Sequence, residues 1–187
     1  MSVKDFVQQR RDALIAMRRD FHMYPEPAWL EYRSAAKVAD TLISLGYDVA
    51  LGADVLDLES RMGLPSDEVM KAAMDRAIKE GANPELVEKM GYGKTAIVAT
   101  MKFGGEGPVV AFRVDMDSND VIEAKDDNHV PAKGGFRSCH DKAMHACGHD
   151  AHMTMGLGLA EYLATHKDEF KGTIKLIFQP AEEGVRG

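Results

Sequence analysis

The sequence has few features of secreted or membrane proteins. Two of its 187 residues are cysteine, too few for a disulfide scaffold at this length, so we expect reduced thiols and a cytoplasmic location. The N-terminal letters MSVKDFVQQRRD are charged throughout and lack the apolar core of a signal peptide. No stretch reaches the roughly 18 consecutive apolar residues of a membrane helix, so no membrane contact is expected.

Positive charge is not concentrated anywhere in the chain. There are 23 Lys and Arg against 30 Asp and Glu, for a net charge of -7, and the basic residues are scattered apart from short pairs. A nucleic-acid partner is therefore not expected. The 45% hydrophobic and 28% charged residues are ordinary for a globular protein. The length suits one domain, or one domain plus part of another.

Hydrophobic spacing predicts that helices and strands alternate along the chain. Periodic apolar residues, helix breakers and apolar runs together define the elements. The predicted helices are 3–23, 31–45 and 152–166, and the predicted strands are 47–51, 95–102, 108–114 and 172–178. Between the first two strands, residues 52–93 look like a helical insertion. The alternation predicts an α/β fold, with a mixed sheet layered by helices.

Two further predictions concern the strands at 95–102 and 108–114. The glycine-rich turn at 104–107 between them predicts a tight hairpin. The letters PVVAFRV of the second strand are nearly all apolar, which predicts a strand buried on both faces. Trp29, in the loop after the first helix, is expected to pack in the core.

Three polar clusters follow or flank the predicted strands. They are RVDMD at 113–117, MHACGHDAH at 144–152 and QPAEEG at 179–184. Ligand sites in open α/β sheets lie beyond the carboxyl ends of the strands. We therefore expect these three segments to build one site.

The segment 144–152 has the donor groups of a transition-metal site. It holds three of the seven histidines and one of the two cysteines, and borderline metals prefer imidazole and thiolate ligands. Gly148 permits a tight backbone that brings Cys147 and His149 to one ion. At least one more ligand must come from elsewhere. The alternatives are a buried free cysteine among surface histidines and a Cys–His nucleophile pair.

Carboxylates supply the remaining chemistry. One of Glu182 and Glu183 could bind a metal while the other takes a proton from metal-bound water; the alternative is a solvated loop. One of Asp115 and Asp117 could orient a ligand imidazole; the alternative is capping of the strand end.

Several longer segments together resemble a known enzyme family. They are RRDFHMYPEPAWLEYRSAAKVADTLISLGY, AFRVDMD, MHACGHDAHMTMGLGLAEYL and GTIKLIFQPAEEG. They are similar to the amidohydrolase family of hippurate hydrolases, N-acyl-amino-acid hydrolases and auxin-conjugate hydrolases. The insertion around LGADVLDLESRMGLP is similar to that of the members that hydrolyse p-aminobenzoyl-glutamate. The resemblance covers essentially the whole chain.

The resemblance implies a di-zinc exopeptidase-like catalytic domain that binds two divalent ions, manganese or zinc. It implies that Cys147, His149 and Glu183 are metal ligands, that Glu182 is the general base, and that Asp115 is a carboxylate near the metals. The implied reaction is hydrolysis of the amide bond in N-acyl or p-aminobenzoyl amino acids. The implied partners are a small-molecule amide and a further protein chain, in a homodimer or heteromer.

The chain departs from this family in two respects. Where the family usually reads Asp-Ala-Leu-Pro, this chain has DSND at 117–120, which bears on substrate preference. The family also takes two further His ligands, a dimerisation domain and the last sheet strands from later sequence. We therefore expect residues 1–187 to be the N-terminal part of the catalytic domain and to be inactive alone. The competing hypotheses are a non-catalytic metal-binding or partner-binding fragment, and a thiol-dependent hydrolase with Cys147 as nucleophile.

Overall fold

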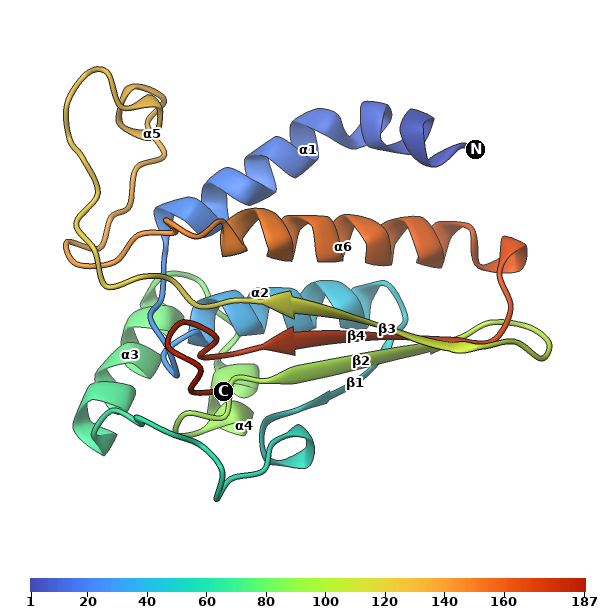
Figure 1. Ribbon diagram of the computed structural model, residues 1–187, viewed down its shortest axis with the longest axis horizontal. Coiled ribbons are helices and arrows are strands. Elements are labelled where there is room, and N and C mark those ends of the chain that lie inside the picture. The colour runs from blue at the N-terminus through green and yellow to red at the C-terminus, as the bar shows by residue number, and fades with distance from the viewer.

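The computed structural model describes residues 1–187 as an α/β fold built on one sheet (Figure 1). Its strands are β1 (Asp48–Leu51), β2 (Ile97–Lys102), β3 (Val109–Asp115) and β4 (Thr173–Gln179). They lie in the order β1-β2-β4-β3. Because β4 is antiparallel to β2 and parallel to β3, the sheet is mixed. The predicted fold class is therefore confirmed.

The predicted hairpin between β2 and β3 is wrong. The turn at 104–107 connects these strands, but β4, which comes from far later in the chain, lies between them. Gly107 shows how closely the turn approaches β4. A Cβ atom there would lie 2.8 Å from backbone atoms of Lys171 and Gly172. A turn signal shows that the chain reverses, but it does not identify the neighbouring strand.

The prediction that β3 is buried on both faces is also wrong. β3 lies at the edge of the sheet, where Val109, Val110 and Phe112 expose 67%, 42% and 45% of their surface. Val110 and Phe112 line an apolar cleft of about 990 Å³ beneath α1 (Val3–Met23) and α6 (His149–Thr165). The apolar residues of β3 therefore line a cleft instead of a closed core. Its edge position follows from having β4 as its one neighbouring strand.

The helices begin where the sequence supplies caps. The remaining ones are α2 (Tyr32–Ser44), α3 (Asp67–Lys79), α4 (Pro84–Met90) and α5 (Val130–Lys133). The side chains of Ser2, Ser66 and Asn83 accept backbone N–H groups at the starts of α1, α3 and α4. Helices α3 and α4 lie between β1 and β2, so residues 52–93 contain the predicted helical segment.

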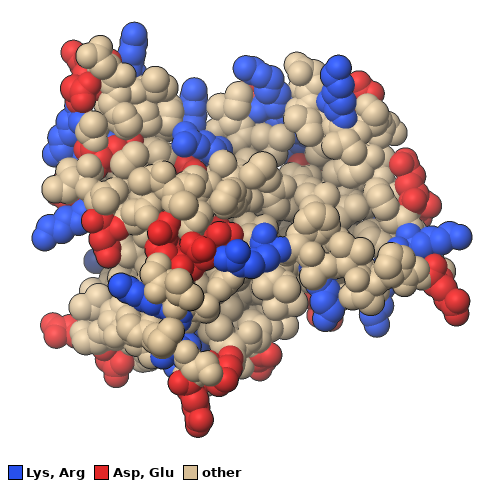
Figure 2. Space-filling model, in the orientation of Figure 1, with Lys and Arg blue, Asp and Glu red and all other residues tan.

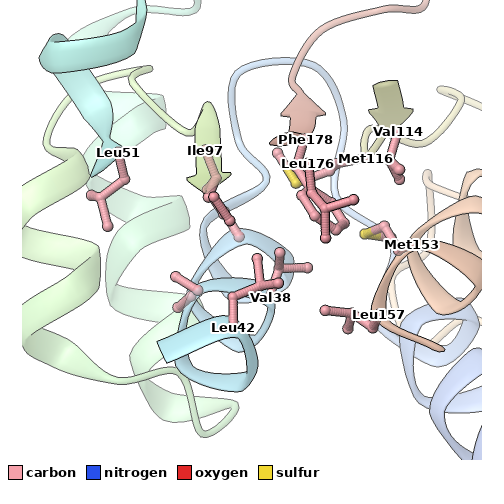
Figure 3. Packing of buried hydrophobic residues seen from close by; sticks show 14 of the residues in the cluster. Val38, Leu42, Leu51, Ile97, Val114, Met116, Met153, Leu157, Leu176 and Phe178 are labelled. Carbon is pink, nitrogen blue, oxygen red and sulfur yellow. The ribbon is translucent and has the colours of Figure 1, made fainter. Parts of the chain in front are cut away.

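The core lies where α2 and α6 pack on one face of the sheet (Figures 1 and 3). α1 packs on α6, while α3 and α4 pack on α2. Figure 3 shows core side chains of both helices and of the sheet, among them Val38, Leu42, Met153, Leu157, Ile97, Leu176 and Phe178. Trp29 is fully buried and donates its indole N–H to the Met62 carbonyl at 2.8 Å, which confirms its predicted core role.

The surface agrees with the scattered charge of the sequence. Acidic and basic side chains are interspersed over the face shown in Figure 2, without a continuous basic area on that face. None of the helices combines the length and apolar character needed to cross a membrane.

Candidate metal centre

The three predicted polar segments meet at one edge of the sheet. β3 and β4 are parallel neighbours, and Asp115 at the end of β3 pairs with Gln179 at the end of β4. Their carboxyl ends therefore lie together. Helix α6 connects the two strands and begins at His149, at the same edge. The rule that places ligand sites beyond strand ends thus located the three segments correctly.

Cys147, His149 and Glu183, here called the strand-end cluster, offer donor atoms that all lie within 4.8 Å of one another. A second set, Asp115, His149 and His152, meets the same criterion. His149 belongs to both sets. Its Nε2 lies 3.5 Å from Asp115 Oδ2, 3.7 Å from Glu182 Oε2 and 3.8 Å from Glu183 Oε1. The structure therefore brings together all five predicted site residues, and adds His152.

The imidazole of His149 is fixed by the backbone. Its Nδ1 lies 2.7 Å from the Asp117 carbonyl oxygen, which can only accept a hydrogen bond, so Nδ1 carries the proton and Nε2 faces the carboxylates. Burial lowers the pKa of His149, but hydrogen bonds to Asp117 and the charge of Asp115 outweigh it and raise that pKa to about 9. This excess of negative charge favours a cation.

Asp117 holds the glutamates as well as the histidine. Its buried carboxylate accepts the Glu182 N–H on Oδ1 and the Glu183 N–H on Oδ2, both at 2.9 Å. Burial raises the pKa of Asp117, but hydrogen bonds from His149, Glu183 and Glu182 outweigh it and lower that pKa. The sequence left open which of Asp115 and Asp117 orients the imidazole. The contacts favour Asp117.

Glu31 also supports the backbone at 181–183, which carries the two glutamates. No sequence pattern indicated this role. Its Oε1 accepts the N–H of Ala181 at 2.8 Å and of Trp29 at 3.0 Å, and its Oε2 accepts the Thr95 hydroxyl at 2.7 Å. Ala181 has a φ of 52°, which costs a non-glycine residue roughly 1–2 kcal/mol. Burial and then the charge of Asp117 raise the pKa of Glu31 to about 8.

Residues 117–120, where the sequence differs from the usual family pattern, position the segment that carries Cys147. Asn119 Oδ1 accepts the N–H groups of Ala146 and Cys147, at 3.2 and 3.1 Å. The backbones of Asn119 and Met144 also exchange hydrogen bonds. Gly148 then turns the chain with a φ of 94° into α6. Side chain and glycine together set the separation between the thiol and the imidazole.

The donor set fits a divalent metal ion. Glu183 Oε1 is buried and has no hydrogen-bond partner, so it is free to act as a ligand. Thiolate, imidazole and carboxylate are the donors that zinc and similar ions take. The neighbouring carboxylate of Glu183, then burial and the charges of Glu182 and Asp115, raise the pKa of Cys147. This disfavours the thiol-nucleophile hypothesis, which needs a lowered pKa.

His145, two residues before Cys147, is the remaining histidine of the motif. It is buried, and neither ring nitrogen has a hydrogen-bond partner. Burial lowers its pKa to about 4, so the ring is neutral at physiological pH. The structure places it behind the donors rather than among them, since neither donor set includes it.

Comparison with known proteins agrees with this geometry. Residues 111–187 match the family model described as Peptidase family M20/M25/M40. This part of the chain is therefore similar to members of that peptidase family. Over 185 residues the chain is 47% identical to an indole-3-acetyl-aspartic acid hydrolase of Enterobacter agglomerans. Over 186 residues it is 48% identical to one of the subunits of the p-aminobenzoyl-glutamate hydrolase of Escherichia coli K12. These alignments cover 99% and 100% of this chain, but 42% and 43% of the relatives.

Solved structures extend the M20 similarity to the first half of the chain. An aminobenzoyl-glutamate utilization protein from Klebsiella pneumoniae matches with a TM-score of 0.82 and 41% identity, over all of this chain and 41% of that one. A Bacillus subtilis protein described as a dinuclear metal-binding peptidase of the M20 family matches with a TM-score of 0.61 and 29% identity, over 96% of this chain and 36% of that one. This chain thus spans less than half the length of the relatives it matches.

Proposed function

We propose that this chain is part of a metal-dependent amidohydrolase that cleaves the amide bond of an N-acyl amino acid. The observation that carries the proposal is the pair of donor sets sharing His149, with Glu182 beside them. The M20 match of residues 111–187 supports it. So do two relatives of nearly equal identity, both named as hydrolases of amides.

The proposed cofactors are two divalent metal ions, manganese or zinc. Cys147, His149 and Glu183 act as ligands, and Asp115 lies beside them with His152 on its other oxygen, at 3.8 Å. The dinuclear description of the Bacillus subtilis neighbour supports the number of ions. The mixed thiolate, imidazole and carboxylate donors favour zinc over magnesium or calcium.

The protein's own groups then have distinct tasks. When bound, the metal ions supply a polarised carbonyl and a water of lowered pKa. Glu182 takes the proton of the attacking water and returns it to the leaving nitrogen. The Arg113 guanidinium lies 3.5 Å from Glu182 and 3.6 Å from Asp115, where it orients both carboxylates. Asp117 and Glu31 fix the turn that carries the base.

The proposed substrates join an aromatic acyl group to an acidic amino acid. Indole-3-acetyl-aspartate and p-aminobenzoyl-glutamate, named for the two relatives, share those two features and differ in the ring system and in the length of the acidic side chain. We therefore expect the substrate of this protein to be an amide of the same class, with either kind of aromatic ring.

Residues 1–187 are proposed to form the N-terminal part of the catalytic domain, with the helical segment 52–93 inserted after the first strand. The relatives extend well beyond the matched region, which supports a larger catalytic unit. The Escherichia coli relative is named as one subunit of its enzyme, which favours a heteromer, and a homodimer is the alternative.

Hydrolysis by the protein as its gene encodes it tests the proposal. We expect release of p-aminobenzoate from p-aminobenzoyl-glutamate, loss of activity after treatment with a chelator, and recovery on adding Mn²⁺ or Zn²⁺. p-Aminobenzoyl-alanine, which lacks the acidic side chain, serves as the matched control and should react more slowly.

Other outcomes would favour the competing hypotheses. Activity that survives the chelator but is lost on alkylation of Cys147 would overturn the metal proposal in favour of the thiol nucleophile. Metal binding without hydrolysis of any N-acyl amino acid would favour the non-catalytic fragment.

A further inference from the structure

A second group of metal-ligand side chains lies away from the strand-end cluster. Glu80, Cys139 and His140, here called the loop cluster, offer donor atoms that all lie within 4.8 Å of one another. Glu80 caps the C-terminus of α3, whereas the other two residues lie in the loop that precedes α6. The proposed hydrolysis does not use any of them.

The imidazole of His140 is oriented as a ligand imidazole would be. Its Nδ1 lies 2.7 Å from the Pro25 carbonyl oxygen, which only accepts, so Nδ1 carries the proton. Nε2 is thereby directed at Glu80 Oε1, at 2.8 Å. Metal-binding histidines typically donate their other nitrogen to a backbone carbonyl in this way. The turn is further fixed by Ser138, whose hydroxyl accepts the His140 N–H and donates to its carbonyl.

One oxygen atom of the Glu80 carboxylate is available to bind a metal ion. Its Oε2 is buried and has no hydrogen-bond partner. Its position at the C-terminus of a helix of 13 residues adds the negative end of the helix dipole, which favours a cation. The side chain of Glu80 exposes 19% of its surface and that of His140 14%, so the site is screened while Cys139 stays open to solvent.

Two arginines are the cations that face this group. Arg33 is paired with both carboxylate oxygens of Asp20, so its charge is largely neutralised. The Nε and one Nη of Arg76 are buried without partners. Burial and then the charge of Glu80 raise the pKa of Cys139, and the charges of Arg33 and Arg76 oppose them. The arginines oppose only part of this rise and also repel a metal ion, so the support for binding comes from the donor geometry.

We propose that Glu80, Cys139 and His140 bind one borderline divalent cation such as Zn²⁺. The donor types are those of the strand-end cluster, and both cysteines of the chain then serve in a Cys-His-Glu set. In each set the histidine Nδ1 lies 2.7 Å from a backbone carbonyl oxygen. Pairing of a thiolate with an imidazole favours zinc over calcium or magnesium.

Binding requires small and definable changes. Two ligands at Zn–N and Zn–O distances of about 2.1 Å in a tetrahedron lie about 3.4 Å apart, so the contact of 2.8 Å between His140 and Glu80 would open by about 0.6 Å. The thiol loses its proton to solvent, and so does Nε2 where it is protonated. The ion would join the end of α3 to the loop before α6 and, through Pro25, to the segment between α1 and α2.

Residue-specific alkylation tests the site in the protein as its gene encodes it. After metal removal, iodoacetamide labelling is followed with and without ZnCl₂ in molar excess over all the proposed metal ions. Trypsin separates the two cysteines because Lys142 lies between them, so mass spectrometry reads each thiol independently. We expect Zn²⁺ to slow labelling of Cys139 by roughly tenfold or more, because a metal-bound thiolate is a poor nucleophile.

Variants identify the ligands. Glu80→Gln and His140→Gln should restore labelling of Cys139, whereas Glu88→Gln, an exposed control on α4, should not. Cys147→Ser should leave protection of Cys139 unchanged, which separates this proposal from the proposed function. Equal labelling of Cys139 with and without Zn²⁺ in the unmodified protein would overturn the proposal, whether or not the variants fold. Protection that persists in both Glu80→Gln and His140→Gln would overturn it as well.

Discussion

The strand-end cluster and the loop cluster contain the same residue types in different surroundings. The strand-end cluster has Asp115, Glu182 and His152 close by, so it offers more donors than one ion needs and a carboxylate to move a proton. The loop cluster has two arginines as its charged neighbours and no second carboxylate in its donor set.

The difference teaches that a donor set alone does not define a catalytic site. Hydrolysis needs a base beside the ion and an open position for water and substrate. The strand-end cluster lies at the carboxyl ends of two parallel strands, where loops leave room. The loop cluster joins a helix end to a turn, as a structural site would. The following experiments test this contrast, from the largest expected effect to the smallest.

Removal of the proposed base should separate the clusters most clearly. Glu182→Gln keeps the shape of the side chain but cannot accept the proton, so kcat should fall about 100- to 10,000-fold. The matched change Glu80→Gln should leave kcat within about twofold, because that residue lies outside the reacting groups. Steady-state hydrolysis of p-aminobenzoyl-glutamate measures both. Equal losses in the two variants would remove the distinction between the clusters.

Loss of the buried support behind the strand-end cluster should reduce stability. Glu31→Ala leaves two backbone N–H groups and a hydroxyl unpaired, which should cost about 2–3 kcal/mol in the free energy of unfolding. Glu31→Gln should cost about 1 kcal/mol or less, since its amide oxygen can accept the same two backbone N–H groups and its NH₂ can donate to the Thr95 hydroxyl. Urea unfolding measures both. A Glu31→Gln loss as large as that of Glu31→Ala would show that the two backbone hydrogen bonds do not account for the stabilisation.

In the strand-end cluster Gly148 separates the cysteine from the histidine, whereas the cysteine and histidine of the loop cluster are adjacent. Gly148 has a φ of 94°, and a Cβ added there would meet no atom within 4 Å; Gly46, at a φ of 83°, is equally open. Alanine at either position should cost about 1–2 kcal/mol in stability. Zn²⁺ titration should show weaker binding at the strand-end cluster in Gly148→Ala alone. Unchanged affinity in that variant would mean that the glycine does not set the ligand spacing.

The smallest effect concerns the ion network behind His149. His22 lies between Asp150 and Glu123, at 2.7 and 2.9 Å. Burial lowers the pKa of His22, but these hydrogen bonds outweigh it and raise that pKa above its usual 6.5. Its stabilising charge is therefore fully present below pH 6.5 and is lost as pH rises through the raised value.

Thermal unfolding across this pH range tests the network. The Tm of the unmodified protein should decline as pH rises above about 6.5, and His22→Gln should lack that part of the decline. Arg10→Gln, which removes a 3.0 Å ion pair with Glu161 outside this network, serves as the control. Parallel curves for the unmodified protein and His22→Gln would show that another group controls the slope.

Local pattern predicted most of the elements but not their neighbours. Apolar spacing predicts a helix over 3–23, and α1 has those bounds. The pairing of β4 between β2 and β3 could not be read from the turn at 104–107. Strand order depends on residues that come about 70 positions later, and no local signal reports them.

The residues of the candidate site were predictable where residue type alone selects them. Cys147, His149 and the two glutamates stand out by residue type and by their position after strands. Glu31 and Asn119 do not, because their roles depend on which backbone N–H groups point at them. Those directions exist only in the folded chain. The choice between Asp115 and Asp117 likewise required the observed contacts with His149.

The position of the donors along the chain has an evolutionary consequence. Every donor of the strand-end cluster lies within residues 111–187, the part matched by the family model. Recombination or gene fusion that exchanged the first hundred residues would transmit this set intact. Glu31 is one condition on such an exchange, beside the pairing of β2 with β4, because it reaches from the first half to the Ala181 amide. An incoming partner sequence would have to present an acceptor at that point.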